Sequence, residues 1–126
     1  MCIRDSSGIK TDKDPDPEKI NGMLSMLDET LKYTFGLSTG LEYSPGLNAK
    51  SAELKEIAKV VGKNNRLIMS HMRNEDDDEL ESSISELLEQ GEYAKIHISH
   101  LKAVYGKGEK RADEILSILD LSLIHI

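Results

Sequence analysis

The stretch that decides the fold is Arg66-Leu67-Ile68-Met69-Ser70-His71-Met72-Arg73-Asn74-Glu75. An apolar run ends in a histidine, which is followed by a basic residue and then by acidic residues. The same order recurs at Ala94-Lys95-Ile96-His97-Ile98-Ser99-His100-Leu101-Lys102, so His100 follows His71 by 29 positions. A βαβ unit takes about 30 residues or more. We therefore predict that both histidines stand at equivalent ends of neighbouring parallel strands and face one shared site.

Helical and strand patterns alternate through the rest of the chain. Four stripes of apolar residues at helical spacing run over 20–31, 54–61, 80–88 and 112–119. Asp16 and Pro17 are typical of the start of the first helix, and Ser51 or a neighbour is expected to cap the second. Short apolar runs at 35–41, 66–70 and 94–99 lie between the stripes.

This alternation predicts the fold class. Strands that alternate with helices favour a parallel sheet with right-handed crossovers. We predict an α/β fold in which three parallel strands are consecutive units of a (β/α)8 barrel of the TIM type. In such barrels the site lies in the loops after the strands. His71, His100 and the segment from Thr39 to Tyr43 all fall in those loops.

Composition argues against several classes of protein. The formal net charge of −7 argues against a nucleic-acid partner, for which a basic surface is expected. No apolar run reaches the roughly 18 residues that suggest a membrane span. The single cysteine cannot form an internal disulfide, which is consistent with a reducing, cytoplasmic compartment.

The two ends of the sequence differ from the part between them. Residues 1–7 and 121–126 resemble translated sequencing-adapter tails, and such segments are left out of fold reasoning. We expect residues 8–120 to be an interior piece of a longer protein, and Cys2 and His125 to have no function. The alternative is a genuine start and a genuine apolar tail.

His71 and His100 are the strongest candidates for chemistry. Imidazole is the commonest metal-ligating side chain, and two histidines on adjacent strand ends can bind one Zn²⁺. The alternative is a pair of loop-edge histidines with ordinary hydrogen bonds, but the repeated pattern favours the metal site. His97 alternates off the His100 face, and we expect it to pack against a helix or to bond a carboxylate. The acidic run 74–79 lacks the calcium-loop spacing and is interpreted as a solvated helix start.

Three further residues are candidates for contact with a substrate. Arg73 and Lys102 each follow a histidine by two positions, so they can receive a substrate carboxylate. They can equally pair with Glu75 or with a neighbouring loop. Tyr43 follows a strand end and can donate a hydrogen bond to a polarised carbonyl. Its alternative role is packing within the loop.

Three motifs together resemble a known family, the N-acyl-D-amino-acid deacylase (D-aminoacylase) branch of the amidohydrolase superfamily. The resemblance covers roughly residues 8–120. The motifs, in the family's order, are Gly36-Leu37-Ser38-Thr39-Gly40-Leu41-Glu42-Tyr43-Ser44-Pro45-Gly46, then Ser70-His71-Met72-Arg73-Asn74-Glu75, then Ile98-Ser99-His100-Leu101-Lys102.

The resemblance implies a fold, a metal and a reaction. The three strands correspond to about the fourth to sixth of a metal-dependent barrel. His71 and His100 match the family's zinc ligands, and Tyr43 and Lys102 match residues near the substrate. The implied reaction is hydrolysis of the amide of an N-acyl-D-amino acid to a carboxylate and a free D-amino acid.

The resemblance also implies that parts of the family's site lie outside this chain. The His-x-His pair, the bridging cysteine and the catalytic aspartate have no counterpart among residues 8–120, so we expect the isolated chain to be inactive. Two alternatives stay open. One is a cyclic-amide hydrolase of the dihydroorotase or hydantoinase kind, and the other is a non-catalytic acidic α/β binding module.

Overall fold

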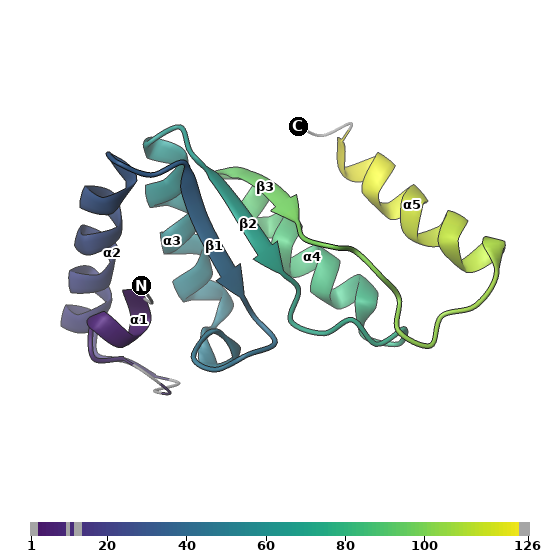
Figure 1. Cartoon of the computed structure of the whole chain (residues 1–126), viewed down its shortest axis with the longest axis horizontal. Coiled ribbons are helices and arrows are strands. Elements are labelled where there is room, and N and C mark those ends of the chain that lie inside the picture. The colour runs from purple at the N-terminus through teal and green to yellow at the C-terminus, as the bar shows by residue number, and fades with distance from the viewer. Residues whose placement is uncertain (1–2, 10, 12–13, 124–126) are drawn as a thin grey trace.

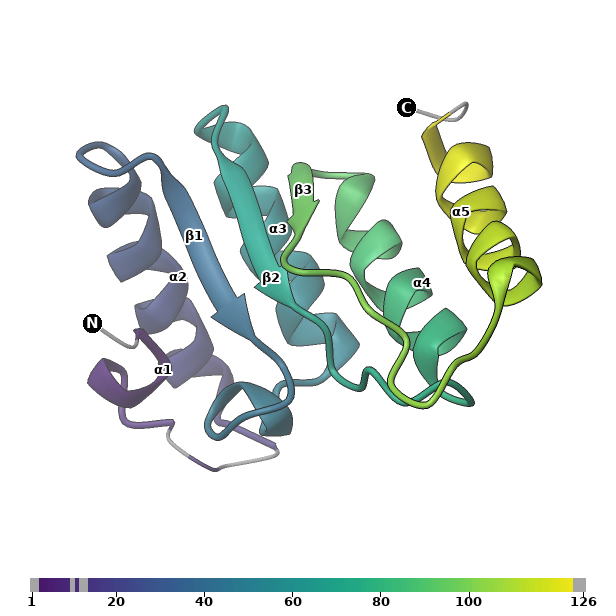
Figure 2. The same ribbon diagram turned by 45° about the vertical axis from the view of Figure 1, so that its right-hand side comes forward.

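The structure, a computed structural model, describes residues 3–9, 11 and 14–123, and within these it contains a sheet of three parallel strands. The strands lie in the order β1-β2-β3, and helices alternate with them along the chain, as predicted. Figures 1 and 2 show α2, α3 and α4 against one face of the sheet, with α5 beyond β3. The elements are α1 (Ile3–Ser6), α2 (Pro17–Leu31), β1 (Gly36–Gly40), the 3-10 helix η1 (Gly46–Asn48), α3 (Ser51–Lys63), β2 (Leu67–His71), α4 (Leu80–Gly91), β3 (Lys95–Ile98) and α5 (Glu109–Leu123).

The register of the strands divides the sheet into a covered face and an open face. Leu37, Ile68 and Ile96 lie side by side and pack into the core with the helices. The next row along the strands contains Met69 and His97, which are both exposed. The expectation that His97 packs against a helix is therefore wrong, because the strand pleat turns it to the face that carries no helix.

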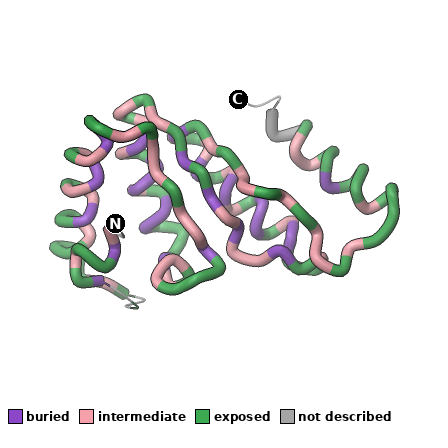
Figure 3. Tube along the Cα trace, viewed as in Figure 1, coloured by how far each residue is buried: buried purple, intermediate pink, exposed green. Residues whose placement is uncertain are grey.

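Two apolar clusters hold the helices on the covered face. The first joins α2 to α3 and β2, and the second joins α4 to the loops after β1 and β2. Figure 3 shows the buried residues on the inner sides of these helices. Burying a side chain such as leucine stabilises the fold by about 1.5–3 kcal/mol. The members of the clusters include Met23, Leu27, Leu31, Ile57, Ala58, Val61 and Ile68 in the first, and Leu41, Leu54, Met72, Leu80, Ile84 and Leu87 in the second.

The helix starts follow the predicted signals in part. The Asp16 carboxylate accepts a hydrogen bond of 2.8 Å from the backbone N–H of Glu18, so it caps α2 as predicted. At α3 the N-cap position is occupied by Lys50, which makes no side-chain capping hydrogen bond. Ser51 is instead the first helical residue, so neither it nor its neighbour Lys50 supplies the expected side-chain cap.

The N-terminal helix is tied to the body of the domain by a buried ion pair. Arg4 donates from Nε to Glu53 Oε1 over 2.7 Å and from the second guanidinium nitrogen to Oε2 over 2.8 Å. The described part of segment 1–7 is therefore packed against α3. The assignment of 1–7 and 121–126 as adapter-derived stays a prediction, and Cys2 and His125 lie outside the described residues. Among the described helices, none has the length and apolar character to cross a membrane.

Candidate metal site

His71 and His100 meet at the carboxyl-terminal edge of the sheet. His71 is the last residue of β2, and His100 lies in the turn just after β3. His100 has a φ of 38°, in the left-handed region that is uncommon for residues other than glycine. The two ring centroids are 4.6 Å apart, and the ring planes are nearly perpendicular at 88°. The structure thus brings the two histidines together, as the repeated motif predicts.

Glu75 is the third member of this cluster. It is only 5% exposed. Its Oε1 lies 3.2 Å from Nδ1 of His100 and 3.7 Å from Nδ1 of His71, while its Oε2 pairs with the ammonium of Lys102. A carboxylate at this depth needs a compensating charge, and Lys102 supplies it.

The interpretation of 74–79 as a solvated helix start is wrong for Glu75. Helix α4 begins only at Leu80, and the residues before it pair with the segment after β3. Val104 donates its backbone N–H to the carbonyl of Glu75 over 2.8 Å, and Asp76 forms a parallel bridge with Val104. This pairing buries Glu75 while Asp76 and Asp78 stay exposed. The sequence singles out Glu75 only as an alternative partner for Arg73 or Lys102, and in the structure it pairs with Lys102.

Two buried polar atoms in the cluster have no hydrogen-bond partner, namely Nδ1 of His71 and Oε1 of Glu75. Such atoms are rare in native structures, and a missing ion is one of the explanations for them. His71, Glu75 and His100 each offer a ligand atom, and these atoms lie within 4.8 Å of one another. Donors around one tetrahedral zinc lie about 3.3 Å apart, given bonds of about 2 Å. The residues present therefore fit a divalent metal ion.

Tyr43 and Lys102 complete the site. The hydroxyl of Tyr43 lies 3.1 Å from Nε2 of His71, and Glu42 Oε2 lies 3.0 Å from the same nitrogen. The hydrogen bond with Glu42 is the main reason that the pKa of Tyr43 is raised. The pKa of Lys102 is raised chiefly by its hydrogen bond with Glu75, so its ammonium stays charged. Both side chains are about half exposed, so they can meet a small molecule at the rim.

Known proteins of similar sequence and structure include two deacylases. Over 78 residues, or 61% of the chain, the sequence is 38% identical to an N-acyl-D-glutamate deacylase of Alcaligenes xylosoxydans xylosoxydans. Over 88% of the chain it resembles a crystal structure of N-acyl-D-glutamate deacylase from Bordetella bronchiseptica, with 32% identity and a TM-score of 0.81. That enzyme is complexed with zinc and a phosphonate inhibitor that mimics the tetrahedral intermediate of its reaction. The chain is a partial homologue of these deacylases.

A D-aminoacylase, described as defining a novel subset of amidohydrolases, has the same fold over 97% of the chain, with 22% identity and a TM-score of 0.84. The homologous region is a minor part of each relative. The chain spans 16% of the Alcaligenes deacylase, 24% of the Bordetella deacylase and 26% of the D-aminoacylase. No protein-family model matches the chain. The three parallel strands with their helices thus match part of a D-aminoacylase-type amidohydrolase.

Arg73 lies apart from the histidines in this deacylase homologue. Its Nε and one terminal nitrogen donate to the carboxylate of Glu86 on α4 over 2.9 Å each. The two terminal nitrogens also donate to the carbonyls of Leu47 and Ala49 over 2.8 and 2.9 Å. These contacts hold the loop around η1 against α4. Pairing with a neighbouring loop is the alternative that the sequence left open for Arg73. These contacts do not support a role for Arg73 in binding substrate.

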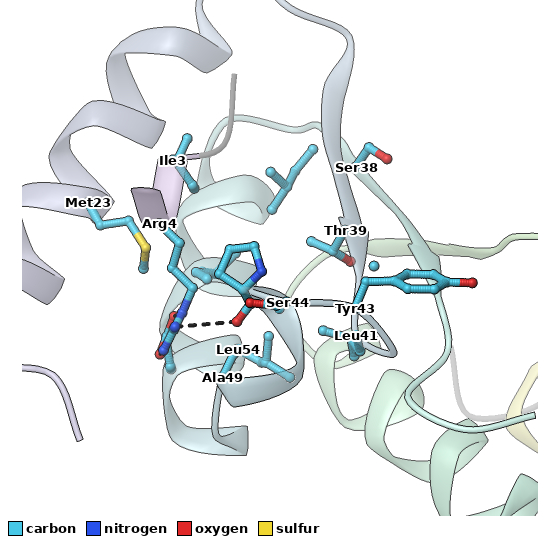
Figure 4. A pocket seen from close by; sticks show the side chains of 16 residues that line it. Ile3, Arg4, Met23, Ser38, Thr39, Leu41, Tyr43, Ser44, Ala49 and Leu54 are labelled. Carbon is cyan, nitrogen blue, oxygen red and sulfur yellow. Dashed lines mark hydrogen bonds and ion pairs between the residues drawn. The ribbon is translucent and has the colours of Figure 1, made fainter. Parts of the chain in front are cut away.

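A separate cavity of about 360 Å³ lies at the outer edge of β1, between α1, α3 and η1. Among the described residues that line it, the charged ones are Arg4 and Glu53, which pair with each other. Figure 4 shows Tyr43 at its margin with the hydroxyl directed away from Arg4. The hydroxyl of Tyr43 reaches His71 instead, so it joins the cluster at the sheet edge rather than the buried ion pair of this cavity.

Proposed function

We propose that the longer protein to which this chain belongs hydrolyses the amide bond of N-acyl-D-amino acids, and that this chain supplies two of its zinc ligands. The observation that carries the proposal is the convergence of His71 and His100 on the buried carboxylate of Glu75. The homology to deacylases, one of them bound to zinc and a mimic of the tetrahedral intermediate, supports the same reaction. Within the proposal, the chain contributes strands four to six of a (β/α)8 barrel in the cytoplasm.

Within this proposal, each side chain of the site has its own role in binding zinc or substrate. His71 offers Nδ1, which is buried and without a hydrogen-bond partner, as a zinc ligand, and His100 offers the second imidazole. Zinc, when bound, polarises a substrate carbonyl and lowers the pKa of an attacking water. Tyr43 donates a hydrogen bond to the carbonyl oxygen, where negative charge develops. Lys102 keeps a charged ammonium at the rim and receives the carboxylate of the amino-acid portion.

N-acyl-D-glutamate is the substrate to test first. The two relatives with more than 30% identity both carry the name N-acyl-D-glutamate deacylase. This substrate has two carboxylates, and one of them matches the ammonium of Lys102. The alternative enzyme function is hydrolysis of cyclic amides, but no contact of the described residues favours it. A non-catalytic module is disfavoured because the two histidine rings meet at the sheet edge.

Zinc titration of the 126-residue chain tests the ligand assignment. We expect one zinc per chain, and we expect His71→Ala and His100→Ala each to abolish binding in competition with a chromophoric chelator. His97→Ala is the matched control, because His97 is an exposed histidine of β3 that is not among the three residues whose ligand atoms converge. Unchanged zinc affinity in either cluster variant would refute the ligand assignment.

The activity is tested in the longer protein. We expect zinc-dependent release of D-glutamate from N-acetyl-D-glutamate and no release of L-glutamate from the L-isomer. If the longer wild-type protein binds zinc but releases no D-glutamate from N-acetyl-D-glutamate, the proposed substrate class is contradicted. Cleavage of a dihydropyrimidine or a hydantoin in place of the acyl amino acid would support the cyclic-amide alternative.

A further inference from the structure

We infer that Glu75 is the positioning residue of the metal site. It fixes the tautomer of His100, so that Nδ1 carries the proton and Nε2 is the free ligand nitrogen. The inference rests on the proposed function, because it assumes that His100 is a zinc ligand. It goes beyond it by assigning a role to Glu75, for which the sequence predicts no part in the metal site.

The first step is the position of the carboxylate relative to the ring. Glu75 Oε1 lies 3.2 Å from Nδ1 of His100. In a neutral imidazole one nitrogen carries a proton and the other a lone pair. A lone pair on Nδ1 would face a carboxylate oxygen at this distance and repel it, whereas an N–H attracts it. Nδ1 of His71 lies farther from the same oxygen, at 3.7 Å, so the carboxylate selects the proton on the nearer ring, His100. Oε1 of Glu75 has no hydrogen-bond partner in the structure, so this contact is electrostatic, and it places the proton on Nδ1 of His100.

The second step is that Glu75 is itself fixed. Its Oε2 pairs with the ammonium of Lys102, and its backbone carbonyl accepts from Val104 over 2.8 Å. It is 5% exposed, so water does not screen it from the ring. The carboxylate is thus a rigid group with one oxygen turned to a cation and the other turned to His100.

The third step compares the two rings. Nε2 of His71 has the hydroxyl of Tyr43 and the carboxylate of Glu42 beside it, at 3.1 and 3.0 Å. This leaves Nδ1 of His71, a buried atom without a hydrogen-bond partner, as its free nitrogen. The two imidazoles then present different nitrogens, Nδ1 from His71 and Nε2 from His100. Metal-binding histidines commonly donate their other ring N–H to a carboxylate, and Glu75 and Glu42 have the required positions.

Glu75→Gln is the sharpest variant, because it is nearly isosteric and must reverse the tautomer. An ammonium only donates, so the amide oxygen of glutamine must turn toward Lys102. The amide NH₂ then faces Nδ1 of His100 and requires a lone pair there. The proton moves to Nε2, which is the nitrogen that the metal needs. Loss of an outer-shell partner of this kind typically lowers metal affinity by about 10- to 100-fold.

The experiment reads the tautomer of His100 in the metal-free chain by long-range ¹⁵N–¹H correlation, at a pH where the ring is neutral. We expect the Nδ1–H form in the wild type and the Nε2–H form in Glu75→Gln, together with a zinc affinity lower by about 10- to 100-fold. Asp78→Asn is the matched control, because Asp78 is an exposed acid of the same segment, and it should change neither result. His97 serves as an internal control for the spectra.

The outcomes separate the inference from the proposed function. An Nε2–H tautomer of His100 in the wild type would overturn the inference, even if the glutamine variant did not fold. Lower zinc affinity in Glu75→Gln with an unchanged tautomer would also overturn it and would identify Glu75 as a direct ligand. If His100→Ala binds zinc normally, the proposed function fails, whatever tautomer is found.

Discussion

His71 and His100 meet edge to face with their ring centroids 4.6 Å apart, although each is carried by a different strand. The parallel register explains the contact, because β2 and β3 run side by side and end at the same edge of the sheet. The left-handed backbone at His100 accompanies the contact, with a φ of 38° just after the end of β3. The length of the β-helix-β unit therefore brings the two equivalent histidines to the same sheet edge, where their imidazole rings face each other.

The attachment of α5 should depend on pH. Arg111 donates to both carboxylate oxygens of Glu81 on α4, over 2.6 and 3.0 Å, and to Asp77 over 2.5 Å. The hydrogen bond from Arg111 lowers the pKa of Glu81 below its ordinary value. We expect Arg111→Gln to lower the free energy of unfolding modestly at neutral pH, because solvent screens this partly exposed pair.

The direction of this pH effect follows from the lowered pKa of Glu81. A carboxyl whose pKa is lower in the folded state stabilises the fold above its unfolded pKa, and that contribution is lost as pH falls through the folded pKa. The difference between wild type and Arg111→Gln should therefore shrink in acid, as measured by urea unfolding at several pH values. Lys110→Gln, at a side chain 93% exposed, is the control. A difference that stays constant into acid would contradict the ion-pair explanation.

Replacing one partner of the buried ion pair between Arg4 and Glu53 should lower the free energy of unfolding strongly. Both side chains are about 5% exposed, and Glu53→Gln removes the carboxylate charge that faces the guanidinium of Arg4. Breaking such a pair typically costs about 3–5 kcal/mol. Glu56→Gln, at a side chain of α3 that is 47% exposed, should cost about 0–1 kcal/mol. Equal urea-unfolding free energies for the two variants would show that α1 is not held to α3 by this pair.

Two helical glycines should respond to alanine in opposite directions. A Cβ at Gly62 would lie 1.7 Å from the carbonyl oxygen of Tyr93, so Gly62→Ala should destabilise the fold by about 1–3 kcal/mol. A Cβ at Gly22 would meet nothing within 4 Å, and Gly22 lies inside α2. Gly22→Ala should therefore stabilise by about 0.8–1 kcal/mol. Thermal and urea unfolding measure both, and a loss of stability at Gly22 would contradict the open surroundings.

Much of the fold could be predicted from local sequence signals. The stripe that contains Met23, Leu27 and Leu31 predicts the buried face of α2, and Asp16 predicts its cap. The recurrence of His71 and His100 predicts the shared edge, because a parallel β-helix-β unit returns the chain to that edge. These signals are local or periodic, so they can be recognised in the sequence without knowledge of the tertiary structure.

What the sequence could not decide is which charged side chain lies inside and which pairs with which. Glu75 is one acid in an acidic run, and only the bridge between Asp76 and Val104 sets its burial. Arg73 precedes Glu75 by two positions, yet its guanidinium turns to Glu86 on the far side of the loop. His97 is in an apolar run, but the strand pleat turns it outward.

The sequence by itself determined the order of helices and strands and the pair of histidines at one edge, because periodicity and spacing encode both. Only the tertiary structure decided that Glu75 lies beside His71 and His100 and that Lys102 balances its charge. The reason is physical. A carboxylate tolerates burial only where partners from distant segments replace its water, and those partners meet only when the sheet has formed.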